Sequence, residues 1–292
     1  MNGPCLPNFF IAGAPKSGTT SLYHYLDQHP EIYMSRVKEP HYFASEIRRE
    51  RFSKRLQPQA EQQARALREY LEGPMHESRF SGPVTEWSDY LKLFQHAKGQ
   101  KAIGEASVCY LWAESAPGNI RASIPGARII LVLRNPVEMM FSMYLHTLRS
   151  GSIRCTFREA IEMGLAQRGG EIDLFHPFLD LGLYHAQVQR VLETFPEEQV
   201  RVYWYEDFRA QPLGMLADIF LFLGVDPTFR PDISKRYLES QAPGLLLESE
   251  DRSYLTEFYR EDIQKLSDLL GRDLSKWLGC RGGLLAAHGD YE

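Results

Sequence analysis

The sequence of 292 residues has few cysteines and no long apolar run. The four cysteines form no Cys-x-x-Cys pair and lie far apart, at Cys5, Cys109, Cys155 and Cys280. This spacing predicts reduced thiols rather than a disulfide framework or a metal site. The longest strongly apolar run is IILVL at 129–133, far short of a membrane span, and no basic segment precedes the first apolar run. We therefore expect a cytoplasmic protein without a signal peptide and without a membrane partner.

An excess of positive charge is also missing. The formal net charge is −5, with 43% apolar and 24% charged residues, which is an ordinary globular composition. No global positive field would attract nucleic acid, so we expect no nucleic-acid partner. Three of the histidines lack metal-ligand spacing, and we expect surface or packing roles for His146, His176 and His185.

Strand-like and helix-like segments alternate along the chain. Short apolar runs that are typical of buried strands lie at 8–13, 101–105, 128–133 and 199–204. Helical patterns lie between and after them, at 19–29, 136–149, 156–166, 182–194, 211–223 and 252–270. This alternation predicts one α/β domain over 1–292, with a central parallel sheet and helices on both faces.

The stretch 45–86 interrupts this alternation. Its residues 72–86, EGPMHESRFSGPVTE, are typical of an irregular loop. Basic side chains are frequent in the stretch, among them Arg48, Arg49, Arg51, Lys54, Arg55, Arg65 and Arg68. Two interpretations stay open: a solvated helical insertion, and a lid whose basic residues meet an anionic acceptor or the cofactor.

The most informative motif is GAPKSGTT at 13–20, between the first strand and the first helix. The spacing of Gly13, Gly18 and Thr20 fits a nucleotide-binding P-loop, but Thr19 stands where such a loop carries its lysine. The lysine is Lys16, inside the loop. Backbone N–H groups at a glycine-rich turn and a helix N-terminus bind tetrahedral oxyanions. Lys16 would lie beside the group nearest the loop, where it can neutralise charge on a leaving oxygen without a metal.

A second motif follows the strand at 128–133. Arg134 stands at the carboxyl end of this strand, the edge at which open parallel sheets bind ligands. On the next helix, Ser142 shares a polar stripe with Glu138, His146 and Arg149. Core packing therefore does not explain Ser142.

The stretch 13–43 resembles the 5′-phosphosulfate loop of sulfotransferases that use 3′-phosphoadenylyl sulfate (PAPS), and it is most similar to the heparan sulfate and bacterial carbohydrate branch. LRNPVEMMFSMY at 133–144 is similar to the second motif of that family, R-[DN]-P-x5-S-x-Y, which holds the 3′-phosphate. The stretches 179–208 and 255–278 resemble later segments of bacterial members. The resemblance covers nearly the whole chain apart from 45–86.

This resemblance implies a P-loop-like fold and a metal-independent reaction. A sulfuryl group would pass from PAPS to a hydroxyl or amine of a small-molecule or saccharide acceptor, leaving adenosine 3′,5′-bisphosphate. Lys16 would stabilise the leaving oxygen, Glu39 in KEPH (38–41) would be the general base, and His41 would orient it or bind acceptor. The implied donor-binding residues are Lys16, Ser17, Gly18, Thr19, Thr20, Arg134, Ser142, Tyr184, Lys235 and Arg236.

Several alternatives remain open at this stage. Glu39 could have no role beyond an ion pair with Lys38 or Lys16. Glu105, at the end of a predicted strand, is the rival candidate for the general base. Ala106 stands where the heparan sulfate enzymes usually carry lysine, which weakens the case for that acceptor. A nucleotide kinase or other P-loop NTPase is disfavoured by Thr19 and by the lack of an Asp that would hold Mg²⁺ at a strand end. A non-catalytic bisphosphate-binding protein is the third candidate.

Overall fold

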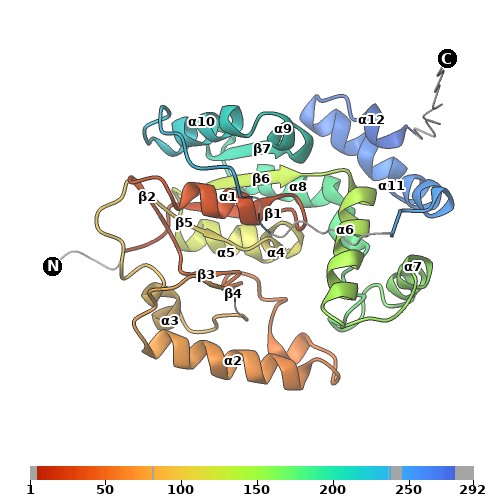
Figure 1. Ribbon diagram of the computed structural model, residues 1–292, viewed down its shortest axis with the longest axis horizontal. Helices are drawn as coiled ribbons and strands as arrows, with labels where there is room; N and C mark the ends of the chain where they lie inside the picture. Colours follow the sequence, from red (N-terminus) through yellow and green to blue (C-terminus); the bar gives the residue numbers. More distant parts are fainter. Residues whose placement is uncertain (1–4, 81, 236, 238–244, 280–292) are drawn as a thin grey trace, which may run out of the picture.

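A fully parallel five-stranded sheet forms the centre of the computed structural model, which describes residues 5–80, 82–235, 237 and 245–279 (Figure 1). The strand order is β2-β5-β1-β6-β7. The strands are β1 (Phe9–Gly13), β2 (Ile32–Met34), β5 (Ala102–Ala106), β6 (Arg128–Leu133) and β7 (Val200–Trp204). Because the strands are parallel, their carboxyl ends meet at one edge, where such sheets bind ligands. The predicted α/β class with a central parallel sheet is confirmed.

Helices cover both faces of the sheet, so β1, β2, β5 and nearly all of β6 are buried on both sides, whereas β7 at the edge of the sheet keeps Arg201 exposed. Phe9 and Ile11 of β1 pack on the face of α1 (Thr19–Leu26) and α10 (Pro212–Leu223). Phe10 and Ala12 pack on the opposite face, which is covered by α4 (Cys109–Trp112), α5 (Ala116–Ser123) and α8 (Tyr184–Thr194). Burial on both sides explains why β1 and β6 read as continuous apolar runs.

The remaining helices frame this core. They are α2 (Gln57–Glu72), α3 (Trp87–Lys92), α6 (Pro136–Arg149), α7 (Phe157–Ala166), α9 (Tyr205–Ala210), α11 (Ser249–Leu270) and α12 (Ser275–Leu278), with short turns η1 (Arg49–Arg51), η2 (Asp180–Gly182) and η3 (Glu197–Gln199). Trp277 of α12 is buried against Trp204. No described helix is long and apolar enough to span a bilayer. The cytoplasmic location stays a prediction.

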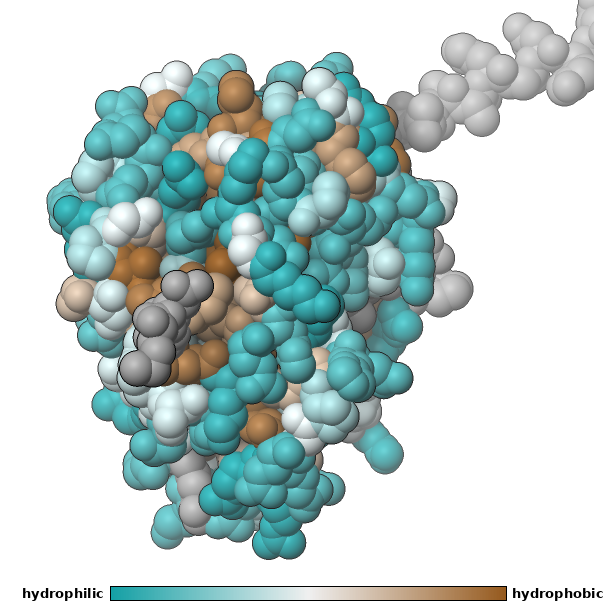
Figure 2. All heavy atoms as spheres, turned by 90° about the vertical axis from the view of Figure 1, so that its left-hand side faces the viewer, coloured by the Kyte–Doolittle hydropathy of each residue, from teal (hydrophilic) through white to brown (hydrophobic). Residues whose placement is uncertain are grey.

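The insertion at 45–86 is tied to the chain segment that carries Glu39. Its strand β4 (Arg79–Phe80) pairs in parallel with β3 (Val37–Lys38), and the Val84 N–H donates to the Pro40 carbonyl. Helix α2 buries Leu67 and Leu71. The lower part of Figure 2, over this insertion, is mostly hydrophilic. Five of its basic residues are exposed, which favours the solvated interpretation for Arg51, Lys54, Arg55, Arg65 and Arg68.

Element boundaries follow the sequence closely where a cap marks them. Helix α6 spans the predicted 136–149, because Pro136 opens it and the Asn135 side chain accepts from two N–H groups of the first turn. Helix α1 ends at Leu26 rather than at 29, and α11 begins at Ser249 rather than at 252. Strand β2 was not predicted, since three residues are too few for a period and only the pairing with β5 defines them.

Candidate active site

The loop between β1 and α1 has the geometry of an anion site. Lys16 and Gly18 both adopt left-handed backbone conformations, with φ of 57° and 79°. A Cβ on Gly18 would lie 3.1 Å from the Tyr205 ring, and one on Gly13 would lie 2.7 Å from Cβ of Leu111, so the loop requires both glycines. Left-handed turns at a helix N-terminus direct N–H groups into a shared concavity that binds oxyanions.

Cationic side chains gather around Lys16. Burial lowers the pKa of Lys16 to about 8, and the charges of Arg134, Arg149 and Lys38 act in the same direction. Within the described part of the chain, neither Lys16 nor Arg134 has an ion pair with a carboxylate. This crowding of like charge at an N–H-rich loop is complementary to a polyanionic ligand.

Arg134 supports the loop directly. Its Nη1 donates to the Lys16 carbonyl at 2.8 Å, and its guanidinium carbon lies 4.6 Å from the centre of the Tyr205 ring. The predicted position at the carboxyl end of β6 is confirmed. Arg134 thus connects two neighbouring strand ends and fixes the position of the loop lysine.

Ser142 and Tyr184 are less accessible than the sequence indicates. Ser142 is only 8% exposed, because α6 turns its polar face toward the loop. Tyr184 is completely buried, with its ring against Trp277. The Tyr184 hydroxyl lies beside the backbone of Arg134, and the expected contact of Tyr184 with the donor stays a prediction.

Two residues near the loop were missed as site residues. His146 and Arg149 follow Ser142 at helical spacing, so all three share one face of α6. Burial lowers the pKa of His146, and the charges of Lys16 and Arg149 lower it further. His146 is exposed, as the sequence predicts, but it belongs to the surroundings of Lys16. The i, i+4, i+7 spacing from Ser142 is the signal that identifies both residues.

Glu39 lies at the same edge of the sheet, held by two donors. Its N–H donates to the Ala106 carbonyl at the end of β5. Oε1 accepts from Nζ of Lys38 at 2.5 Å, and Oε2 accepts from the Val108 N–H at 2.9 Å. Glu39 also has a φ of 64°, a strained conformation that persists only where surrounding contacts hold it. The side chain of Glu39 is 17% exposed.

His41 does not hydrogen-bond to Glu39. Its Nδ1 lies 3.9 Å from Oε2 of Glu39, beyond hydrogen-bond distance, and 3.0 Å from Sγ of Cys109. The backbone N–H of His41 donates to the Ser107 hydroxyl. The role of orienting Glu39 is therefore carried by Lys38 and the Val108 N–H rather than by His41.

Glu105 is placed where it cannot serve as a base for a bound acceptor. Its side chain is fully buried, and its carboxyl group lies beside the Tyr110 hydroxyl. Burial raises the pKa of Glu105 to about 8; a contact with the Tyr110 hydroxyl lowers it, and the charge of Glu39 adds to the increase. Glu105 is therefore mostly protonated at neutral pH, and the geometry favours Glu39 over its rival.

This burial predicts a pH dependence of stability. The folded protein retains the Glu105 proton between its ordinary pKa of 4.5 and about 8, so the free energy of unfolding falls as pH rises through that interval. We expect Glu105→Gln to remove this slope and to stabilise the protein at pH values above it by an amount on the order of a few kcal/mol. Urea unfolding at several pH values measures the effect. Glu72→Gln, at an exposed position, is the matched control, and an unchanged slope in Glu105→Gln would contradict the prediction.

The last two predicted donor-binding residues, Lys235 and Arg236, belong to a segment that contacts α1. Tyr25 donates to the Lys235 carbonyl, Ser21 accepts from the Tyr237 N–H, and the His24 and Tyr237 rings stack at 3.9 Å. Lys235 itself is exposed, with Nζ over the Tyr237 ring. Arg236 lies outside the described residues. The donor contact of Lys235 stays a prediction.

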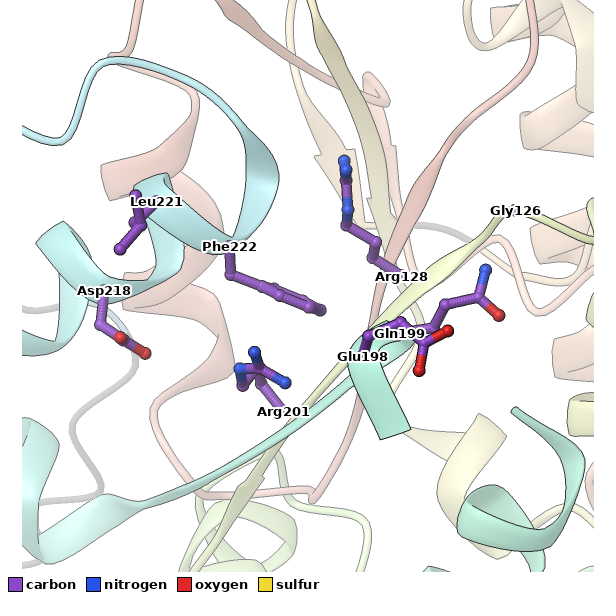
Figure 3. Close-up of a pocket in the computed structure, with 8 residues that line it drawn as sticks. All are labelled: Gly126, Arg128, Glu198, Gln199, Arg201, Asp218, Leu221 and Phe222. Atoms are coloured by element: carbon purple, nitrogen blue, oxygen red, sulfur yellow. The ribbon is translucent and has the colours of Figure 1, made fainter. Parts of the chain in front are cut away.

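A separate hollow lies at the opposite edge of the sheet, at the amino ends of β6 and β7 (Figure 3). Three of the four charged side chains that line it have partners: Arg201 stacks on Phe222, Arg128 donates to a backbone carbonyl, and Asp218 accepts from Tyr203. It shares no residue with the loop or with Glu39. Among the described residues, no three His, Cys, Asp or Glu side chains gather as a metal ion requires.

Comparisons with known proteins agree with this geometry. The model of the sulfotransferase family matches residues 7–230. A solved sulfotransferase from Alicyclobacillus acidocaldarius is 34% identical, with a TM-score of 0.78 and coverage of 94% of this chain and 99% of that chain. The membrane-associated sulfotransferase kil1 of Dictyostelium discoideum is 23% identical over 94% of this chain and 67% of its own length.

Human carbohydrate sulfotransferase 15 is 27% identical over 94% of this chain, which spans 55% of that protein. The chain thus spans about half the length of this relative. The match of the family model covers most of the chain, including the phosphate loop, the Glu39 segment, and Arg134 with Ser142. On this basis the chain belongs to the sulfotransferase family.

Proposed function

We propose that the protein transfers a sulfuryl group from PAPS to a hydroxyl or amine of a small-molecule or saccharide acceptor. The observation that carries this proposal is the crowding of Lys16, Arg134, Arg149 and Lys38 around an N–H-rich loop. Such a site matches a donor with a phosphosulfate at one end and a 3′-phosphate at the other. The name of carbohydrate sulfotransferase 15 supports a saccharide as the acceptor class.

Lys16 and the loop would stabilise the leaving group. In sulfuryl transfer the bond between sulfur and the bridging oxygen breaks, and its electron pair stays on that oxygen. A cation and N–H groups already in place stabilise the developing charge without reorganisation at the moment of reaction. Arg134 contributes by donating a hydrogen bond to the Lys16 carbonyl. The 3′-phosphate of the donor would lie near the guanidinium groups of Arg134 and Arg149.

Glu39 would accept the proton of the acceptor. A new bond forms between the acceptor oxygen or nitrogen and sulfur, and the acceptor proton passes to the carboxylate. Lys38 and the Val108 N–H hold the two oxygens of Glu39 in place. The fully buried Glu105 has no surface on which an acceptor could lie.

The two alternatives make different predictions. A P-loop NTPase would prefer a nucleoside triphosphate with Mg²⁺, and its loop lysine would follow the second glycine rather than precede it. A non-catalytic binding protein would bind the bisphosphate but would not turn over PAPS. The accessible carboxylate of Glu39 beside the loop favours catalysis.

We expect adenosine 3′,5′-bisphosphate to stabilise the protein more strongly than ATP with Mg²⁺. At about 100 times Kd the free energy of unfolding should increase by ~2.7 kcal/mol. Thermal unfolding with each nucleotide measures the effect. Arg134→Ala should reduce the shift, while Arg68→Ala at an exposed position of α2 should leave it unchanged. A larger shift with ATP and Mg²⁺ would contradict the sulfotransferase proposal.

A further inference from the structure

The thiol of Cys109 lies within hydrogen-bond distance of the imidazole of His41, the neighbour of Glu39 in the KEPH motif. Cys109 begins α4, and its Sγ lies 3.0 Å from Nδ1 of His41. The nearest oxygen of Glu39 lies 3.9 Å from the same nitrogen and already accepts the Val108 N–H. Of the two groups, only the thiol lies within hydrogen-bond distance of Nδ1.

The backbone around this contact holds both partners in place. His41 has a φ of 55°, and its N–H donates to the Ser107 hydroxyl at 3.1 Å. Val108, which binds Glu39, precedes Cys109 directly in the chain. One turn after β5 thus positions the carboxylate through a backbone N–H and the imidazole through a side chain.

Both groups carry the proton state that a thiol-to-nitrogen hydrogen bond requires. Burial raises the pKa of the Cys109 thiol well above its ordinary value, and the charges of Glu39, Glu105 and Glu46 add to this. Burial lowers the pKa of His41; Glu39 opposes this shift and Lys38 adds to it. A protonated thiol therefore faces a neutral ring. Neutral imidazole has one donor and one acceptor nitrogen, so a proton donated to Nδ1 leaves the ring proton on Nε2.

We propose that Cys109 is a positioning residue that donates its S–H to Nδ1 of His41 and keeps the ring in the Nε2–H tautomer. His41 is then a hydrogen-bond donor to an oxygen of the acceptor and not a second base. The acceptor proton passes to Glu39 alone. This catalytic consequence depends on the proposed sulfuryl transfer, whereas the tautomer itself does not.

Nitrogen NMR of histidine-labelled protein tests the tautomer directly, with His41→Asn to assign the signals. We expect the Nε2–H pattern for His41 in the unmodified protein and in Cys109→Ser, which keeps a donor. In Cys109→Ala, the Nδ1–H form should become populated. Cys155→Ala, which removes a thiol far from His41 in the sequence, is the matched control and should leave the spectrum of His41 unchanged.

Turnover of radiolabelled PAPS, with a panel of saccharides and phenols as acceptors, tests the consequence. Loss of the hydrogen bond that keeps His41 in the donor tautomer predicts a decrease in kcat of about tenfold for Cys109→Ala, with recovery in Cys109→Ser. A His41 ring that is Nδ1–H or doubly protonated in the unmodified protein would overturn the proposal, as would an unchanged tautomer in a folded Cys109→Ala. If Cys109→Ala does not fold, the unmodified protein and Cys109→Ser still decide the question. Absence of PAPS turnover in the unmodified protein would overturn the proposed function and leave the NMR result intact.

Discussion

Replacement of Lys16 with alanine is expected to lower kcat by about 10²–10³-fold, because one preorganised donor to the leaving oxygen is lost. The fold should be retained, since Lys16 is crowded by like charges and has no ion pair with a carboxylate in the described part of the chain. Turnover of radiolabelled PAPS measures kcat, and thermal unfolding confirms the fold. A normal kcat in Lys16→Ala would contradict the assigned role.

Two comparison variants separate this effect from a general loss of positive charge. Lys54→Ala removes an exposed charge on the insertion and should leave kcat unchanged. Arg134→Ala should mainly weaken donor binding, because a 3′-phosphate keeps the same charge in the ground state and the transition state. Because Arg134 also donates a hydrogen bond to the Lys16 carbonyl, we expect kcat of Arg134→Ala to fall as well, but by less than kcat of Lys16→Ala.

Replacement of Glu39 with glutamine is expected to lower kcat by at least about 10²-fold while donor and acceptor still bind. The amide has nearly the same shape but accepts no proton. It also directs an NH₂ group toward either Lys38 or the Val108 N–H, so a loss of stability is expected and must be measured alongside kcat. The kinetic assay is repeated at a temperature at which both proteins are folded.

Glu105→Gln is the matched control for Glu39→Gln, since both remove one carboxylate next to the end of β5. We expect Glu105→Gln to keep a near-normal kcat, because the buried carboxyl is mostly protonated at neutral pH and meets no ligand surface. Activity that survives in Glu39→Gln and disappears in Glu105→Gln would show that the base was assigned to the wrong residue.

The sequence determined the features that depend on short stretches of chain. Gly13 and Gly18 define the loop, and the alternation of apolar runs with helical stripes predicts the parallel sheet. The bounds of α6 follow from Asn135 and Pro136. These signals are local, because caps, glycine conformations and periodicities are properties of consecutive residues.

Only the tertiary structure decided which of the predicted residues act together. Glu39 and Glu105 have similar sequence signals, yet one keeps exposure between two donors and the other is fully buried. The burial of Tyr184 is a tertiary property, and His146 and Cys109 lie beside Lys16 and His41 through contacts between distant segments. Burial and the proximity of charges depend on how separate elements pack, and a linear pattern does not carry that information.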